Sequence, residues 1–288
     1  MKLGEALMEA QARLQAVSDS ARLDAELLLS QLSGLGRAQL VARLRDELPP
    51  ADAQALDALV ARRARGEPIA YITGEKGFWT LRLQVTPAVL VPRPETELLV
   101  EWALELLREC RAPRIADLGT GSGAIALALA AERPDARVEA TEASEDALAV
   151  ARRNATDLGL ERVQLHHGHW LEPLEGSFDL LLSNPPYVAH DDPHLDALRH
   201  EPLSALTDGG DGLNALREIV ATAPPYLRAG GWLLVEHGYD QGAAVRELFR
   251  HAGFAEVATR RDYAGQERAT AGRNLAAFPL SRLPSPAP

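Results

Sequence analysis

Apolar residues recur at helical spacing along the first quarter of the chain. Leu3, Leu7 and Leu14 lie four and seven residues apart, and similar spacing recurs around Leu28 and Leu56. Such intervals place apolar side chains on one face of an α-helix. Glycines near residue 35 and a proline pair at 49–50 interrupt the pattern. The pattern predicts a small all-helical domain over residues 1–75. We expect it to position a substrate, with a purely stabilising appendage as the alternative.

Residues 76–96 are predicted to form a connector. The apolar-rich segments 81–85 and 88–91 flank Thr86 and Pro87. Two strand-like segments around a turn predict a β-hairpin. Gly74 and Gly77 lie just before it and suggest a hinge about which the helical domain moves. A helix is expected from residue 97.

Strand-like and helix-like segments alternate from about residue 112, which is typical of a doubly wound α/β sheet. We expect strands at 114–118, 137–141, 163–167, 178–183, 232–236, 254–258 and 274–278. Helices are expected at 124–132, 145–156, 212–228 and 240–251. The pattern predicts one α/β domain over residues 97–278. The tail 279–288 contains four prolines and is expected to be disordered.

Composition is that of an ordinary globular protein, with 46% hydrophobic and 25% charged residues among 288. The N-terminal residues lack the apolar core of a signal peptide, and no apolar run approaches the roughly 20 residues that span a bilayer. Cys110 is the single cysteine, so neither an internal disulfide nor a thiolate metal cluster is expected. We therefore expect a cytoplasmic protein. The net charge of −11 disfavours stable binding to nucleic acid.

The most informative stretch is the apolar segment 178–183 followed by Asn184, Pro185, Pro186 and Tyr187. Prolines cannot donate to a sheet ladder, so the strand must end there. The side-chain oxygen of Asn184 and the carbonyl of Pro185 offer two acceptors beside an aromatic ring. Such a slot suits a planar group that carries an NH2, either an amide or the exocyclic amine of a base. The alternative is an ordinary polar strand end and turn.

A glycine loop links the first strand of the sheet to the next helix. It comprises Asp117, Leu118, Gly119, Thr120, Gly121, Ser122 and Gly123. Glycines at alternate positions allow a tight turn and close approach of a ligand to the backbone. Glu142, after the second strand, is suited to bind ribose hydroxyls. These features fit either an NAD-dependent oxidoreductase or an enzyme that uses S-adenosylmethionine.

Two observations favour the methyl donor. Asp117 precedes the glycines, where a carboxylate would hold an amino group and repel a pyrophosphate. The fourth strand ends in the amine-binding slot, and no hydride-transfer residues are apparent. In a doubly wound sheet, the first and fourth strands both end at the switch point, so donor and acceptor are expected to face each other.

The combination of motifs resembles the release-factor glutamine methyltransferase family (HemK/PrmC type). The resemblance covers the connector and the whole α/β domain, and its most specific motifs lie at 66–74, 78–79 and 91–97. Further matching motifs lie at 117–123, 184–187, 201–202, 236–238 and 261–263. It implies a class I methyltransferase (Rossmann-like) sheet, mostly parallel with an antiparallel last strand. It also implies transfer of a methyl group from S-adenosylmethionine to the side-chain amide nitrogen of the glutamine in the Gly-Gly-Gln motif of release factors, which yields S-adenosylhomocysteine.

By the same resemblance, residues 119–123 hold the donor, Glu142 holds its ribose and Trp170 borders its adenine. Asn184 would contact donor and glutamine, with Pro185, Pro186 and Tyr187 completing the slot. One position departs from the family, which usually has an acidic residue where this chain has His169. No metal site is expected, and we expect a monomer. The alternatives are an adenine-N6 methyltransferase acting on nucleic acid, an NAD-dependent oxidoreductase and a non-catalytic adaptor of the translation machinery.

Overall fold

The computed structural model describes residues 1–276, and the chain divides into two compact units between Glu75 and Lys76. The first unit is entirely helical. Its helices are α1 (Leu3–Leu14), α2 (Ala21–Ser33), α3 (Arg37–Ala42), α4 (Pro50–Ala64) and α5 (Ile69–Thr73). The apolar positions that share one helical face form a single core, to which Leu7, Leu14 and Leu28 contribute fully buried side chains. Helix α5 ends at Gly74, whose left-handed φ of 76° is typical of a helix C-terminus.

A buried ion pair links two helices of this unit. Asp24 of α2 is 3% exposed, and the Arg63 side chain of α4 donates to it over 2.7 Å. The carboxylate is therefore compensated, as a buried charge must be.

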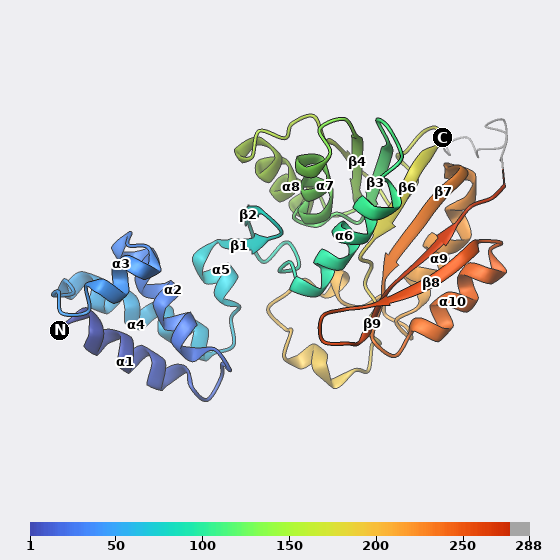
Figure 1. The fold of residues 1–288 in the computed structure, drawn as a ribbon. Helices are drawn as coiled ribbons and strands as arrows, with labels where there is room; N and C mark the ends of the chain where they lie inside the picture. Colours follow the sequence, from blue (N-terminus) through green and yellow to red (C-terminus); the bar gives the residue numbers. More distant parts are fainter. Residues whose placement is uncertain (277–288) are drawn as a thin grey trace. The chain divides into compact units, whose positions relative to one another are not determined.

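The second unit contains a short hairpin and a seven-stranded sheet (Figure 1). The hairpin strands are β1 (Glu75–Phe78) and β2 (Leu81–Gln84). The sheet contains β3 (Arg114–Leu118), β4 (Arg137–Glu142), β5 (Gln164–His167), β6 (Phe178–Ser183), β7 (Leu227–Glu236), β8 (Ala255–Arg261) and β9 (Glu267–Arg273). Its helices are α6 (Glu97–Leu106), α7 (Ala124–Glu132), α8 (Glu145–Asp157), α9 (Asn214–Thr222) and α10 (Gly242–His251). Short 3-10 turns occupy Pro94–Thr96, Pro193–Asp196, Leu203–Ala205 and Pro224–Tyr226.

The strand order is β5-β4-β3-β6-β7-β9-β8. Strands β5, β4, β3, β6 and β7 pair in parallel, and β9 pairs antiparallel with both β7 and β8. This is the doubly wound, mostly parallel sheet with an antiparallel last strand that was expected.

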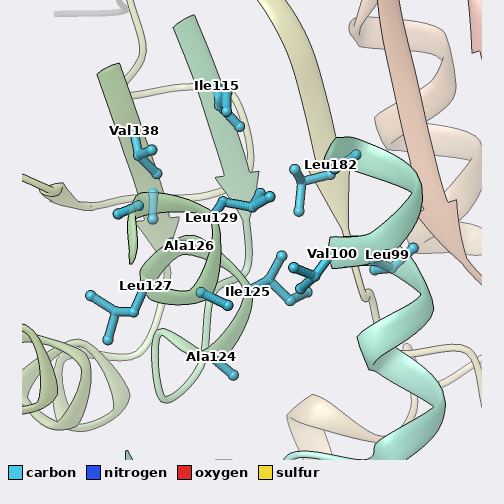
Figure 2. Close-up of a cluster of buried hydrophobic side chains, with 14 of the residues drawn as sticks. Leu99, Val100, Ile115, Ala124, Ile125, Ala126, Leu127, Leu129, Val138 and Leu182 are labelled. Atoms are coloured by element: carbon cyan, nitrogen blue, oxygen red, sulfur yellow. The ribbon is translucent and has the colours of Figure 1, made fainter. Parts of the chain in front are cut away.

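Both faces of the sheet are covered, which explains why its strands are apolar at consecutive positions. Ile115 packs with α6 and α7, whereas its neighbour Ala116 packs with α9 and α10 on the other face. Figure 2 shows Ile115 and Leu182 of the sheet beside Leu129 of α7 and Val100 of α6. Helix α7 is buried along nearly its whole length, so its sequence is apolar on every side.

Two predicted strands are wrong. Residues 88–91 are not a strand: the N–H of Val89 donates to Thr86 in a turn, and that of Val91 donates to the Glu201 side chain. The hairpin partner of β2 is instead β1. Gly74 just before this strand and Gly77 within it are untypical of strand sequences, so β1 was not predicted. The last strand is β9 and not 274–278; residues 274–276 are irregular, and 277 and 278 lie outside the described residues. The predicted tail 279–288 lies outside them as well.

The sequence of β9 does not resemble that of a strand, and packing against β9 explains its glycine. Its sequence contains little apolar surface and includes Gly272, which sequence patterns count against a strand. A Cβ atom at Gly272 would lie 2.5 Å from Cδ1 of Phe249 and 2.9 Å from Cβ of Phe254. Two aromatic side chains therefore pack directly on the backbone of this strand, and a glycine is required.

Candidate active site

The ends of β3 and β6 place the two predicted motifs side by side. Leu118 and Ser183 are register partners in the parallel ladder, so Gly119 and Asn184 leave the sheet at the same level. Strand β3 also lies between β4 and β6, which is the point where the strand order reverses. Ligands of open α/β sheets bind at the carboxyl ends of strands at such a point. The predicted juxtaposition of the two motifs is confirmed.

A cavity of about 500 Å³ opens at this point, which is within the range of ordinary small-molecule sites. Its walls include eight predicted site residues: Gly119, Thr120, Gly121, Ser122, Glu142, Trp170, Asn184 and Pro186. Four predicted site residues do not line this cavity but are neighbours in the chain of residues that do: Asp117, Gly123, Pro185 and Tyr187.

The glycine loop turns sharply because its glycines adopt left-handed conformations. Gly119 has a φ of 74°, and a Cβ atom there would lie 2.8 Å from Cζ3 of Trp170. Gly123, with a φ of 85°, precedes α7 and leaves no room for a Cβ atom beside Leu127. Both positions combine a φ and a close contact that only glycine accommodates.

Asp117 is completely buried at the end of β3. The Thr120 hydroxyl donates to its Oδ2 over 2.6 Å, whereas Oδ1 has no partner of ordinary hydrogen-bond geometry among residues 1–276. Burial raises the pKa of Asp117 to about 7, and the Thr120 hydrogen bond opposes that rise. A buried acceptor without a partner, directly beneath the loop, is consistent with a site that gains a donor when a ligand binds.

Glu142, the last residue of β4, tethers the glycine loop. Its Oε2 accepts from the N–H of Gly121 over 2.8 Å, and its Oε1 accepts from that of Ser144 over 3.0 Å. Each carboxylate oxygen has a further lone pair. The side chain can therefore fix the loop and still accept hydrogen bonds from ribose hydroxyls.

Asn184 and Tyr187 are both held from behind. The Nδ2 of Asn184 donates to Oγ1 of Thr96 over 3.1 Å, and the Tyr187 hydroxyl donates to Oε1 of Glu236 over 2.9 Å. Glu236 is 1% exposed, and burial raises its pKa to about 7. The nearby Thr96 and Tyr187 hydroxyls lower this pKa again. Desolvation raises the pKa of Tyr187, so its hydroxyl stays protonated and remains a donor.

The far end of the cavity, after β5, contains Trp170, His169 and Glu218. Trp170 has a positive φ of 43°, and the rings of His169 and Trp170 are 5.1 Å apart. The Nδ1 atom of His169 lies 3.4 Å from a carboxylate oxygen of Glu218 in α9. Position 169 carries a histidine where the family usually has an acidic residue. The acidic side chain of Glu218, from α9, lies beside it.

The segment between Tyr187 and α9 forms one wall of the cavity through residues Pro202, Ser204, Ala205, Thr207 and Asp208. Glu201 fastens this wall to the segment before α6. Its carboxylate accepts from the N–H of Val91 over 3.0 Å and pairs with Arg93, while its side chain is only 2% exposed. Pairing with Arg93 compensates the buried charge.

Sequence reasoning missed Thr96 and Asn154. Asn154 is 1% exposed in α8, and its amide bonds the backbone of Gln84 in both directions and the carbonyl of Ser122. It thereby joins hairpin strand β2 to the glycine loop. Thr96 lies within the motif at 91–97 that carries the family resemblance, whereas Asn154 is a single polar side chain without a motif. For Asn154, a polar residue at an otherwise apolar helix position was the available signal.

Comparison with known protein families gives two matches. Residues 5–74 match the PrmC N-terminal domain, and residues 95–211 match the methyltransferase small domain. Among residues 1–276, none of the helices combines the length and apolarity that a membrane crossing requires.

Curated relatives match over nearly the whole chain. The release factor glutamine methyltransferase of Xylella fastidiosa (strain 9a5c) is 53% identical over 255 residues, which cover 88% of this chain and 93% of the relative. The enzyme of that name from Escherichia coli (strain K12) is 47% identical over 270 residues, covering 93% and 97%. That from Pseudomonas aeruginosa is 51% identical over 259 residues, covering 89% and 94%.

Solved structures of lower sequence identity share the fold. A methyltransferase from Pyrococcus furiosus has a TM-score of 0.51 at 20% identity and covers 74% of this chain and 96% of its own. A 16S rRNA methyltransferase of T. thermophilus, solved in complex with AdoMet and guanosine, has a TM-score of 0.52 at 21% identity and covers 69% and 49%. These similarities show the class I methyltransferase fold.

Proposed function

This chain belongs to the release factor glutamine methyltransferase family, and we propose that it methylates peptide chain release factors. The methyl group passes from S-adenosylmethionine to the side-chain amide nitrogen (N5) of the glutamine in the Gly-Gly-Gln motif, leaving S-adenosylhomocysteine. One observation carries the proposal: the glycine loop and Asn184 leave adjacent strands at the same level and line one cavity.

The donor fits the walls of the cavity in one direction. The sulfonium must face Asn184 after β6, and the ribose must reach Glu142 after β4. The sheet order then requires the adenine to lie beyond the ribose, at the end of β5. His169 and Trp170 are at that end. Residues 119–123 hold the methionine part, and Asp117 supports them from beneath.

The pair of His169 and Glu218 takes the place of the acidic residue that the family usually has. A neutral histidine that donates from Nδ1 to a carboxylate leaves Nε2 as an acceptor. Either that nitrogen or the Glu218 carboxylate itself is suited to accept from the adenine amino group. Glu218 therefore belongs to the donor site in this proposal.

Asn184 and Pro185 align the glutamine. The Oδ1 of Asn184 and the carbonyl of Pro185 accept the two amide hydrogens, and Tyr187 stacks on the amide plane. The amide nitrogen forms a bond to the methyl carbon as the carbon–sulfur bond breaks, and the nitrogen then releases a proton to water. An amide is a poor nucleophile, so alignment is the main contribution of the protein. Holding the reacting atoms in line accounts for about 7–11 kcal/mol of a barrier in favourable cases.

The helical unit, residues 1–75, serves in this proposal to position the release factor, and residues 97–278 perform the transfer. We propose a monomer in the cytoplasm, where release factors act, without stable binding to nucleic acid. Light scattering at micromolar concentration and a mobility-shift assay at moderate salt test these statements. A dimer would contradict the first, and a shifted duplex would favour the alternative of adenine-N6 methylation.

Mass spectrometry of a purified bacterial release factor tests the reaction. After incubation with this protein and S-adenosylmethionine, we expect one added methyl group on the Gly-Gly-Gln glutamine. A release factor with Gly-Gly-Ala is the substrate control, and Asn184→Ala is the enzyme control. An unmodified glutamine, with S-adenosylhomocysteine binding intact, would refute the proposed substrate.

A further inference from the structure

Thr96 lies directly behind the Asn184 amide. It is 4% exposed, lines the cavity at the start of α6, and its Oγ1 accepts from Nδ2 of Asn184 over 3.1 Å. A threonine hydroxyl has one hydrogen and two lone pairs. While it accepts from Asn184, its own hydrogen is available to another acceptor. The Glu236 carboxyl lies close enough for the Thr96 hydroxyl to lower its pKa, so it is the acceptor available to that hydrogen.

Glu236 is suited to hold this hydrogen. It is the last residue of β7 and is almost fully buried. Its Oε1 accepts from the Tyr187 hydroxyl, whereas Oε2 is buried without a partner of ordinary hydrogen-bond geometry among residues 1–276. Above pH 7, where Glu236 is ionised, its carboxylate only accepts hydrogen bonds. The Thr96 hydrogen satisfies it best by turning toward it.

We propose that Glu236 and Thr96 are positioning residues that fix which end of the Asn184 amide faces the substrate. Glu236 takes the Thr96 hydrogen, so Thr96 can only accept from Asn184. The NH2 of Asn184 is therefore turned toward Thr96, and its Oδ1 is turned toward the cavity. This inference rests on the proposed function and deepens it.

The orientation has a consequence for specificity. An Oδ1 that faces the cavity accepts a hydrogen bond from the NH2 of a glutamine side chain. A glutamate carboxylate has no hydrogen to donate, so its oxygens would repel Oδ1. A reversed Asn184 would present its NH2 and would receive a carboxylate well. Reversal requires the Thr96 hydrogen to leave Glu236, which would deprive a buried carboxylate of a donor. Glu236 thus selects amide over acid without touching the substrate.

The test compares Thr96→Val, which removes the hydroxyl at nearly constant shape, with Thr96→Ser, which retains it. Thr141→Val is the matched control, since Thr141 is also fully buried and its hydroxyl has no partner among the described residues. We expect Thr96→Val to lower kcat by at least about tenfold, the effect of one lost hydrogen bond at a buried site. We expect Thr96→Ser and Thr141→Val to retain wild-type kcat, and all three variants to bind S-adenosylhomocysteine as the wild type does.

Substrate preference provides a readout that a structural role would not change. The wild type, loaded with S-adenosylhomocysteine, should bind a release factor with Gly-Gly-Gln more tightly than one with Gly-Gly-Glu. In Thr96→Val and in Glu236→Gln that preference should fall by about tenfold. In the glutamine variant, the new amide donates to Thr96, whose hydrogen then turns to Oδ1 of Asn184 and reverses it.

The side-chain NH2 signal of Asn184 in NMR reports the orientation without any substrate. Its assignment comes from its loss in Asn184→Ala. Slow solvent exchange is expected in the wild type and in Thr96→Ser, and fast exchange is expected in Thr96→Val and Glu236→Gln. Equal exchange, or equal kcat in Thr96→Val and Thr96→Ser, would overturn the positioning role. A wild type with slow exchange that leaves release factors unmethylated would instead overturn the proposed function alone.

Discussion

Glu236→Gln is expected to stabilise the second unit at alkaline pH while it lowers activity. Glu236 is buried, and desolvation raises its pKa from 4.5 to about 7 in the folded protein. An unfolded chain releases this proton near the ordinary value. Between about pH 4.5 and 7 the folded state therefore binds more protons than the unfolded state, so stability falls as pH rises through this window. Well above pH 7 both states have released the proton, and the stability that it contributed is lost.

The size of the effect follows from the shift. Each pKa unit corresponds to about 1.4 kcal/mol of folding free energy. The rise from 4.5 to about 7 therefore corresponds to about 3 kcal/mol of stability lost between low and high pH. Asp117, with a pKa raised to about 7 by burial, contributes in the same direction and remains in the variant. Glutamine stays neutral at every pH but replaces the carboxyl imperfectly. We expect Glu236→Gln to be more stable than the wild type by about 1–3 kcal/mol at pH 8 and of similar stability at pH 5.

Urea denaturation at pH 5, 6, 7 and 8 measures this difference. The four tryptophans, at positions 79, 102, 170 and 232, all lie in the second unit, so their fluorescence reports on that unit alone. Glu109→Gln, at an exposed position, is the control and should follow the wild type at each pH. A variant whose stability falls with pH as steeply as the wild type would refute the reasoning, as would one destabilised at pH 8.

Further substitutions test the donor site and the slot. Gly119→Ala should weaken binding of S-adenosylhomocysteine by at least about tenfold in calorimetry, because a Cβ atom would press on Trp170 at a left-handed φ; unchanged affinity would show that the loop tolerates it. Asn184→Ala should reduce turnover by about a hundredfold or more while calorimetry detects little change in donor binding; equal losses in both would remove Asn184 from the alignment. Glu218→Ala should weaken S-adenosylhomocysteine by about fivefold but leave its deaminated analogue unaffected, since the analogue lacks the adenine amino group; parallel losses would assign Glu218 a structural role only.

The sheet and the two motifs were predictable because their signals are local. Apolar residues at 114–118 and 178–183 mark strands buried on both faces, and glycines or prolines end each one. Strands β3 and β6 have the predicted bounds for that reason. The alternation of strands and helices then implies the switch point, and with it the meeting of Gly119 and Asn184.

The errors and omissions have a different physical origin. Val91 is buried, but its N–H donates to Glu201, 110 residues away, and no local pattern reveals a side-chain partner of that kind. Thr96 and Glu236 likewise acquire their roles from the packing of α6 against the end of β7. Polar contacts between distant elements are set by the finished fold, so sequence periodicity does not reveal them.

Because β3 and β6 end at the same level, the sheet fixes the distance between the loop that holds the methyl donor and the loop that holds the acceptor. Neighbouring strands are about 4.8 Å apart, a spacing that backbone hydrogen bonds fix. Donor and acceptor loops begin one such spacing apart, whatever their own sequences are. The loop after β6 is therefore a part that evolution or design can exchange to admit another acceptor, while the distance to the methyl donor stays the same. A single-residue insertion within β6 would have the opposite effect, because it reverses the faces of the strand and shifts the slot out of reach.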